Sequence, residues 1–253
     1  YQPYVAVLEG VRLIAYSNVI YASNSTAIYD TLADPEFGQF VDMHTDPTFV
    51  SYQHGKITAK FPKVSATVER AFNLSGLFAE HFGHWYSEYL PRLRHFEQVN
   101  DFASISILVN RNMPPSHLEM LKYFCDNPVI SVYDSECIKV KKLYVAPTIT
   151  FFPPKLFPNH PVPFERQGAW SAEAMHYMRR KILANVPQDV SQTKAIYLSR
   201  KNSTWGIVSN EDEVEDCLGE LGFEIVQPER LSFSEQVAIL RSCHTIVGAT
   251  GSA

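Results

Sequence analysis

The chain has 253 residues, of which 45% are hydrophobic and 19% are charged, a composition typical of a globular protein with its own core. Its net charge of −5 argues against a nucleic-acid binder that works by neutralising phosphates. No run of about 18 or more apolar residues occurs, so the sequence predicts no membrane-spanning helix.

The first third of the chain favours β structure. Short apolar runs lie at residues 4–8, 11–15 and 19–22, separated by Gly10 and by clusters of Ser and Asn. Runs of this length between turn residues predict a small antiparallel β meander at the N-terminus.

The middle of the chain alternates between helical and extended patterns. Large apolar side chains recur with helical spacing over residues 84–99, where Pro91 is expected to kink or restart the helix. A second helix is predicted from Pro114 to about Phe124, because proline suits a first helical turn. Apolar segments that predict strands lie at residues 104–109, 129–132 and 140–145. This rhythm indicates an α/β layer on a parallel sheet.

A proline-rich stretch, residues 151–165, interrupts the pattern. We expect it to be an inter-domain crossing, with a long surface loop as the alternative. Beyond it, strands are predicted at residues 195–199, 223–226 and 245–248, and helices at residues 171–184, 210–221 and 232–242. The predicted helix signals are Ser171, Asn210 and Ser232 as N-caps, Glu235 as the second member of a capping box, and Gly222 as a stop.

These two α/β runs predict two Rossmann-like domains, residues 1–165 and 166–253, that face each other across a cleft. The sequence given stops after a strand and a turn, where a helix should follow. We therefore expect the protein to continue past Ala253.

Cysteine and sequon patterns bear on the compartment. The four cysteines have no CxxC spacing, so a zinc site is not indicated and buried thiols are expected. Three Asn-x-Ser/Thr sequons, at Asn24, Asn73 and Asn202, are consistent with a glycosylated secretory protein.

His84 and Glu88 are the first candidates for chemistry. They are four residues apart and share a helix face, where a carboxylate can orient an imidazole that takes a proton near neutral pH. Arg92 continues that face and could contact an anion. The alternative is a local His–Glu–Arg network on the surface, with Trp85 and Tyr89 in the core.

Three further segments suit a nucleotide diphosphate or a sugar. Ser199 and Arg200 end a strand where a crevice opens, and a planar guanidinium suits a diphosphate. Glu235 and Gln236 begin a helix and could bind ribose or sugar hydroxyls, although capping alone would also explain Glu235. The glycine-containing turn at residues 248–251 offers backbone N–H groups to a phosphate.

Several catalytic motifs are absent from the sequence. It has no DxD motif, with which a metal-dependent nucleotide-sugar transferase usually holds its ion, so we expect neither a metal nor a cofactor. It also has no P-loop, no HExxH and no GxSxG sequence.

Together these segments resemble glycosyltransferase family 61. The family's His-Trp-x-x-Glu-x-Leu-Pro-Arg-Leu block matches residues 84–93, and its Tyr-x-Ser-Arg strand end matches residues 197–200. Its Asn-Glu helix start, Gly-Phe-Glu strand and Ser-x-x-Glu-Gln helix match residues 210–211, 222–224 and 232–236. Order and spacing agree from about residue 84 onwards.

The resemblance implies a GT-B fold and a metal-independent, inverting transfer from a nucleotide sugar, expected to be UDP-linked, to a hydroxyl of a glycan or protein. His84 or Glu88 is expected to be the base, and the sequence does not choose between them. The resemblance also implies a donor site in the C-terminal domain that comprises Ser199, Arg200, Glu235, Gln236, Gly248, Thr250 and Gly251.

One departure from the family pattern concerns Thr250. The family usually has His-Gly-Ala after the last strand, whereas this chain has Thr250-Gly251-Ser252, which keeps the glycine and loses the imidazole. This loss makes a non-catalytic binding protein for sugars or nucleotide sugars one alternative. A GT-B-like nucleotide-sugar epimerase is a second alternative. We favour a bacterial cytoplasmic enzyme with peripheral contact to the inner membrane, and the secretory lumen is the alternative compartment.

Overall fold

The computed structural model describes residues 4–29, 46–53, 56–60, 62–134, 136–147, 150, 170–186, 190–203 and 206–249. The chain divides into two compact units, one comprising Tyr1–Pro114 and Phe124–Arg179, the other Pro115–Tyr123 and Arg180–Ala253. The proline-rich stretch at residues 151–165 lies outside the described residues. Within the described part, no helix is long and apolar enough to cross a lipid bilayer.

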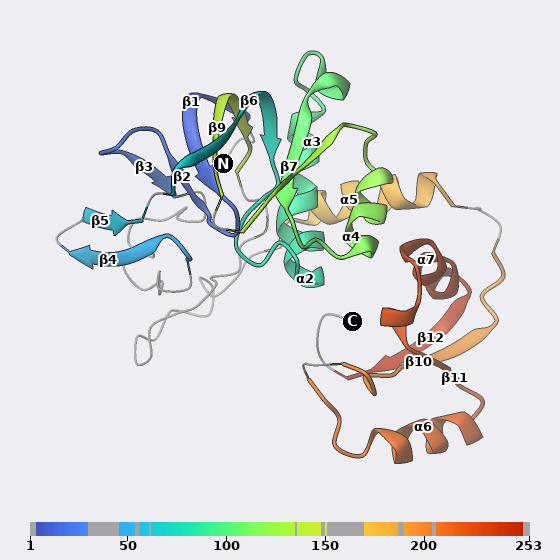
Figure 1. Ribbon diagram of the computed structural model, residues 1–253. Coiled ribbons are helices and arrows are strands. Elements are labelled where there is room, and N and C mark those ends of the chain that lie inside the picture. The colour runs from blue at the N-terminus through green and yellow to red at the C-terminus, as the bar shows by residue number, and fades with distance from the viewer. Residues whose placement is uncertain are drawn as a thin grey trace. The chain divides into compact units, whose positions relative to one another are not determined.

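In its described residues, the first unit is built on a seven-stranded mixed sheet with the order β3-β2-β1-β9-β6-β7-β8 (Figure 1). The strands are β1 (Ala6–Ile14), β2 (Val19–Tyr21), β3 (Ala27–Tyr29), β6 (Val64–Asn73), β7 (Ser106–Asn110), β8 (Val129–Val132) and β9 (Cys137–Val145). Strands β9, β6, β7 and β8 run parallel, and β1 pairs antiparallel with β9. The α/β class and the parallel layer predicted for the middle of the chain are confirmed.

The predicted N-terminal meander is confirmed, but its strands differ from the prediction. β1, β2 and β3 pair antiparallel in chain order. The runs predicted as separate strands at residues 4–8 and 11–15 belong to one strand, because the register between β1 and β9 continues unchanged across Gly10. Gly10 has φ +66°, a left-handed conformation that glycine adopts without a steric penalty, so the strand need not end there.

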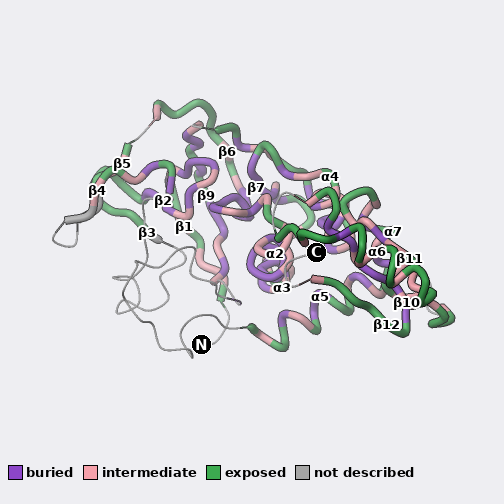
Figure 2. Tube along the Cα trace, turned by 90° about the horizontal axis from the view of Figure 1, so that it is seen from below, coloured by how far each residue is buried: buried purple, intermediate pink, exposed green. Residues whose placement is uncertain are grey.

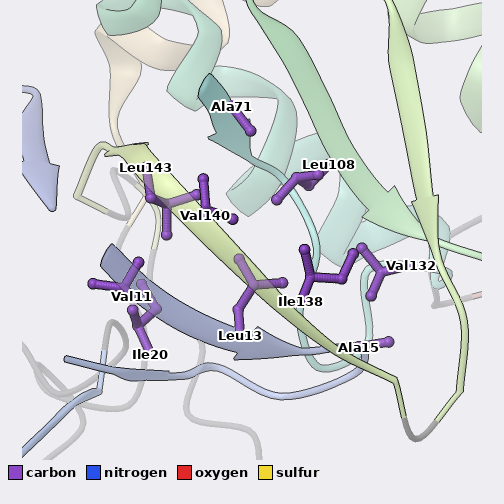
Figure 3. Close-up of a cluster of buried hydrophobic side chains, with 10 residues drawn as sticks. All are labelled: Val11, Leu13, Ala15, Ile20, Ala71, Leu108, Val132, Ile138, Val140 and Leu143. Atoms are coloured by element: carbon purple, nitrogen blue, oxygen red, sulfur yellow. The ribbon is translucent and has the colours of Figure 1, made fainter. Parts of the chain in front are cut away.

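The core of this sheet is aliphatic. Figure 2 shows buried stretches on strands β2, β7 and β9, whereas β6 is buried only at its C-terminal end. One cluster, drawn in Figure 3, joins β1 and β9 to their neighbours and consists of Val11, Leu13, Ala15, Ile20, Ala71, Leu108, Val132, Ile138, Val140 and Leu143. Burial of this many apolar side chains is the main term that stabilises the unit.

Smaller elements complete the first unit. Strands β4 (Phe49–Gln53) and β5 (Lys56–Ala59) form a separate antiparallel pair. Helix α5 (Ala172–Ala184) contains the division between the units, since the first unit ends at Arg179. It begins at Ser171, whose hydroxyl accepts a hydrogen bond from the backbone N–H of Ala174 at 3.2 Å, as predicted for an N-cap.

The sequon at Asn73 is not available for glycosylation in the folded protein. Asn73 is 7% exposed and Ser75 is 3% exposed. The Ser75 hydroxyl donates to the Asn110 side chain at 2.6 Å. Asn24 and Asn202 are exposed, so two of the three sequons keep an accessible asparagine.

The second unit has, in its described residues, a three-stranded parallel sheet with the order β11-β10-β12. Its elements are β10 (Lys194–Leu198), α6 (Glu211–Glu220), β11 (Glu224–Val226), α7 (Phe233–Arg241) and β12 (Cys243–Gly248), together with α4 (Pro115–Lys122). Helices α6 and α7 lie on opposite faces of the sheet (Figure 1). The strand–helix alternation predicted for this region is confirmed.

The helix ends of this unit follow the predictions in part. Ser232 and Glu235 form the predicted capping box at α7, and Gly222, at φ +84°, ends α6 in a left-handed conformation. The predicted cap of α6 is wrong, because the Asn210 side chain bonds no backbone N–H and instead donates to the Glu213 carboxylate at 3.3 Å.

A carboxylate of the protein occupies the start of α7. The two oxygens of Glu119, on α4, accept hydrogen bonds from the backbone N–H groups of Phe233 and Ser234 at 2.8 and 3.0 Å. Burial raises the pKa of Glu119, but these two bonds outweigh it and lower the pKa overall. The positive end of α7 therefore has an internal anion as its partner.

Candidate functional site

The segment that carries the first predicted site is helical but not one continuous helix. It passes from α2 (Phe82–His84) to a π-helix (Trp85–Tyr89), a 3₁₀ turn (Leu90–Arg92) and α3 (Leu93–Phe96). The helical structure predicted over residues 84–99 is confirmed as far as Phe96, where it ends, and its type changes along the segment. The predicted interruption at Pro91 is confirmed, because a proline ring clashes with the carbonyl four residues earlier. Single π-turns of this kind often occur at functional sites.

His84 and Glu88 contact each other directly. The Nδ1 atom of His84 lies 2.8 Å from the Oε1 atom of Glu88. The carboxylate side chain is 8% exposed, while the imidazole is 27% exposed. The pair therefore has a buried carboxylate that orients the ring and an imidazole that solvent can reach.

The π-helix is anchored on the core of the first unit. Trp85 and Tyr89 are almost completely buried, as predicted for core positions. The Tyr89 hydroxyl donates to the backbone carbonyl of Leu77 at 2.7 Å, and the Ser87 hydroxyl donates to that of Gly83 at 2.6 Å. These contacts fix the helix turn on which the His84–Glu88 pair is built.

Arg92 lies beside this pair but is buried, with 3% of its surface exposed. Its Nε donates to the backbone carbonyl of Glu88 at 3.1 Å, and its guanidinium lies 5.0 Å from the centre of the Tyr89 ring. The surface network considered as the alternative is therefore wrong, because Glu88 and Arg92 are both buried. Anion binding by Arg92 stays a prediction.

The second predicted site lies at the C-terminal end of β10 in the other unit. Here Tyr197 and Arg200 meet Glu211, the first residue of α6. The Tyr197 hydroxyl and the Arg200 backbone N–H both donate to the Oε1 atom of Glu211, at 3.0 and 2.7 Å. Burial and the bond to Glu211 raise the pKa of Tyr197 to about 12, so its hydroxyl stays protonated and donates.

Glu211 is a site residue that the sequence prediction did not include. It is 7% exposed, and it joins the Tyr-x-Ser-Arg strand end to the Asn-Glu helix start. Its position in the first turn of α6 suggested only a favourable charge at a helix start. The sequence signal that could have found it is the glutamate in the second of these motifs.

Ser199 and the neighbouring Lys201 are engaged by α6. The Ser199 hydroxyl donates to Glu215 at 2.5 Å and accepts a bond from the Lys201 backbone N–H at 3.2 Å. The Lys201 ammonium lies 2.5 Å from Asp212 and 3.4 Å from Glu215. Ser199 is 2% exposed, so it holds the strand end in place, and donor contact by Ser199 stays a prediction.

The guanidinium of Arg200 lies against the segment that follows. Its Nη2 donates to the Ser203 hydroxyl at 3.2 Å, and the side chain is largely buried. A Cβ atom on Gly206 would lie 3.2 Å from that Nη2, and Gly206 has φ +63°. The absence of a side chain at Gly206 therefore leaves room for the guanidinium.

Replacing Gly206 by alanine is expected to lower stability and, if Arg200 binds the donor as the resemblance implies, to weaken donor binding as well. The left-handed backbone should cost about 1–2 kcal/mol of unfolding free energy, and the new methyl group should displace the guanidinium. Gly222→Ala is the matched control, since Gly222 has φ +84° and a Cβ atom there would meet no atom within 4 Å. Donor titration should show weaker binding for Gly206→Ala alone, and equal effects of both variants would contradict this role.

The predicted donor residues on α7 are engaged locally. The Oε2 atom of Glu235 accepts from the Ser232 backbone N–H at 2.7 Å and from its hydroxyl at 2.6 Å. The Gln236 amide donates to the carbonyls of Pro228 and Leu231, at 2.9 and 3.2 Å. These side chains shape the turn before α7, and their binding to a donor stays a prediction.

The predicted anion turn follows β12. Gly248 is exposed at the end of that strand, beside Leu198 of β10. A Cβ on Gly248 would lie 3.3 Å from the Cβ of Leu198, so the glycine lets the two strand ends approach closely. Thr250 and Gly251 lie outside the described residues.

Over the part of the chain that the structure describes, no group of three His, Cys, Asp or Glu side chains is arranged to hold a metal ion. Cys137 and Cys243 are buried, as expected, and burial raises the pKa of each thiol. The expectation is wrong for Cys217, which is exposed on α6, and Cys125 is only partly buried. The candidate residues thus fall into two groups, the His84–Glu88 pair of the first unit and the strand end around Arg200 in the second.

Comparison with known proteins gives one family match that covers both groups of residues. A family model described as Glycosyltransferase 61 matches residues 82–253, more than half of the chain. The matched segment begins just before His84 and includes the end of β10, α6 and α7. No curated protein matches the chain.

Proposed function

The chain belongs to glycosyltransferase family 61, and from this premise we propose that it is a metal-independent, inverting enzyme that transfers a sugar from a nucleotide-sugar donor to a hydroxyl of a glycan or protein. The observation that carries the proposal is the 2.8 Å contact between His84 Nδ1 and Glu88 Oε1 inside the matched segment. In such a pair the carboxylate orients an imidazole that can act as a general base.

His84 is the better candidate for the base. Exposure favours His84 over Glu88, because the imidazole side chain is 27% exposed and the carboxylate side chain is 8% exposed. With Nδ1–H donating to Glu88, the second ring nitrogen, Nε2, carries the lone pair that can accept a proton. Glu88 then acts as a positioning residue that stabilises the imidazolium formed during the reaction.

The proposed reaction is a single displacement. His84 Nε2 takes the proton of the acceptor hydroxyl as that oxygen forms a bond to the anomeric carbon of the donor sugar. The bond from that carbon to the diphosphate oxygen breaks on the opposite side, and its electron pair leaves with the nucleoside diphosphate. The configuration at the anomeric carbon is therefore inverted.

The leaving diphosphate needs a positive partner, and we assign this role to Arg200. Its backbone N–H is fixed by Glu211 at 2.7 Å, and its guanidinium provides several parallel N–H donors. Lys201 is a weaker candidate, because Asp212 and Glu215 already neutralise its ammonium. We further propose a UDP-linked donor, with backbone N–H groups of the turn at Gly248, Thr250 and Gly251 as additional contacts.

The proposed architecture is GT-B, with acceptor binding in residues 1–165 and donor binding in residues 166–253. A doubly wound α/β unit such as β10–α6–β11–α7–β12 supports the donor assignment, because ligands bind at the C-terminal ends of its strands. We place the enzyme in the bacterial cytoplasm, peripheral to the membrane. Burial of the Asn73 sequon removes part of the reason for a secretory location.

The proposed metal independence, in which Arg200 takes the role of a metal ion, can be tested by removing divalent ions. If a guanidinium stabilises the leaving diphosphate, turnover of the donor should be unchanged in excess EDTA. The rate of nucleotide release, measured with EDTA and after return of Mn²⁺ or Mg²⁺, checks this. Loss of turnover in EDTA, with recovery on addition of either ion, would contradict it.

A further inference from the structure

Phe78 has a backbone conformation that its side chain disfavours. Its φ is +61°, in the left-handed region that bulky side chains rarely enter. The position holds phenylalanine, although glycine would adopt this conformation freely. Residues held in such conformations tend to cluster at ligand-binding and catalytic sites.

The structure around Phe78 holds this conformation firmly. The preceding residue, Leu77, donates its N–H to Asn18 Oδ1 at 2.9 Å and accepts the Tyr89 hydroxyl at its carbonyl. Gly76 exchanges hydrogen bonds with the side chain of Asn110, at 3.2 and 2.7 Å. These contacts come from several elements, so the turn is fixed before any ligand arrives.

The ring of Phe78 lies beside the imidazole of the proposed base. Their ring centres are 5.4 Å apart with an angle of 31° between the planes. His81, which is exposed, lies 5.3 Å from the Phe78 ring and 6.2 Å from the His84 ring. Phe78 is itself half-buried, so part of its surface is open to solvent next to His84.

A sugar ring presents an apolar face of C–H groups as well as hydroxyls, and aromatic side chains can pack on that face. An aromatic surface beside a base would hold the ring while one hydroxyl approaches the imidazole. We infer that Phe78 is a binding residue on which the apolar face of a substrate sugar ring packs next to His84. This inference rests on the proposed function, since it takes His84 as the base.

The variant Phe78→Gly tests this role without threatening the fold. It removes the ring and at the same time places the residue that φ +61° favours, so the protein is expected to stay folded. Asp101→Gly is the matched control, because Asp101 is exposed and has the same φ of +61°. Thermal unfolding of both variants verifies that the fold is kept.

Binding is measured in two arms by saturation-transfer NMR titration. One arm uses methyl glycosides of glucose, galactose, mannose, xylose and N-acetylglucosamine, which represent an acceptor. The other uses the corresponding UDP-sugars, which represent a donor. We expect Phe78→Gly to raise the dissociation constant in one arm by about tenfold, and Asp101→Gly to change neither.

The arm that responds identifies whether the packed ring belongs to the acceptor or to the donor. The inference is overturned if the wild-type protein binds no compound in either arm, or if Phe78→Gly binds them as tightly as the wild type. The proposed function is tested separately by nucleotide release from the same UDP-sugars. If nucleotide is released while Phe78→Gly binds normally, the inference fails and the proposed function stands.

Discussion

Replacing His84 by alanine is expected to lower the turnover number by about 100-fold to 10,000-fold, the usual contribution of a general base. Donor binding should be unchanged, because the imidazole acts on the acceptor hydroxyl and not on the nucleotide. Steady-state rates of nucleotide release and a donor titration measure the two quantities. His176→Ala is the control, since His176 is exposed on α5.

Glu88 should contribute to turnover only by acting on His84. Glu88→Gln keeps the shape of the side chain but removes the charge that stabilises the imidazolium, so turnover should fall less than in His84→Ala. The double variant should be no slower than His84→Ala alone, because residues that act as a unit are not additive. Full activity of His84→Ala, or additive losses in the double variant, would contradict this assignment.

Replacing Arg200 by alanine is expected to lower turnover by about 100-fold to 1,000-fold, the effect of removing one donor to charge that develops in a transition state. Donor affinity should fall as well, since the diphosphate is present before the reaction. Arg200→Lys should restore only part of the rate, because an ammonium cannot bind a diphosphate through a planar fork.

Arg180→Ala serves as the control for Arg200→Ala, because Arg180 is exposed on α5 in the same unit. Turnover and donor affinity are both measured, so a loss of rate can be separated from a loss of binding. If Arg200→Ala keeps the wild-type values of both, Arg200 does not contact the diphosphate.

The sequence predicted the second unit well because its signals are local. Gly222 ends α6 and a capping box begins α7, although the predicted Asn210 cap is wrong. The strands contain short apolar runs. The first unit was predicted less well where pairing is long-range. β6 was missed, because most residues of its first half are exposed and its buried end, from Ala71 to Asn73, is too short for an apolar run.

The candidate site was also predictable only in part. The spacing of His84 and Glu88 predicted their contact, since residues four apart meet on a helix face. The sequence did not predict that the contact occurs in a π-turn. Nor does a local pattern reveal the bond from the Tyr89 hydroxyl to the Leu77 carbonyl that anchors this turn, because the two residues belong to different elements. The role of Glu211 depends on two hydrogen-bond donors from another element. The left-handed conformation of Phe78 depends on the bonds that its neighbour Leu77 makes with Asn18 and Tyr89.

The most direct test of the proposed transfer is the product formed from a nucleotide sugar, followed by ¹H NMR as the reaction proceeds. The purified protein is incubated with a panel of α-linked UDP-sugars and a simple alcohol or glycoside as acceptor. We predict release of UDP together with a β-linked sugar as the first product. A donor that binds but stays intact, a UDP-sugar with altered stereochemistry, or an α-linked product would each contradict inverting sugar transfer.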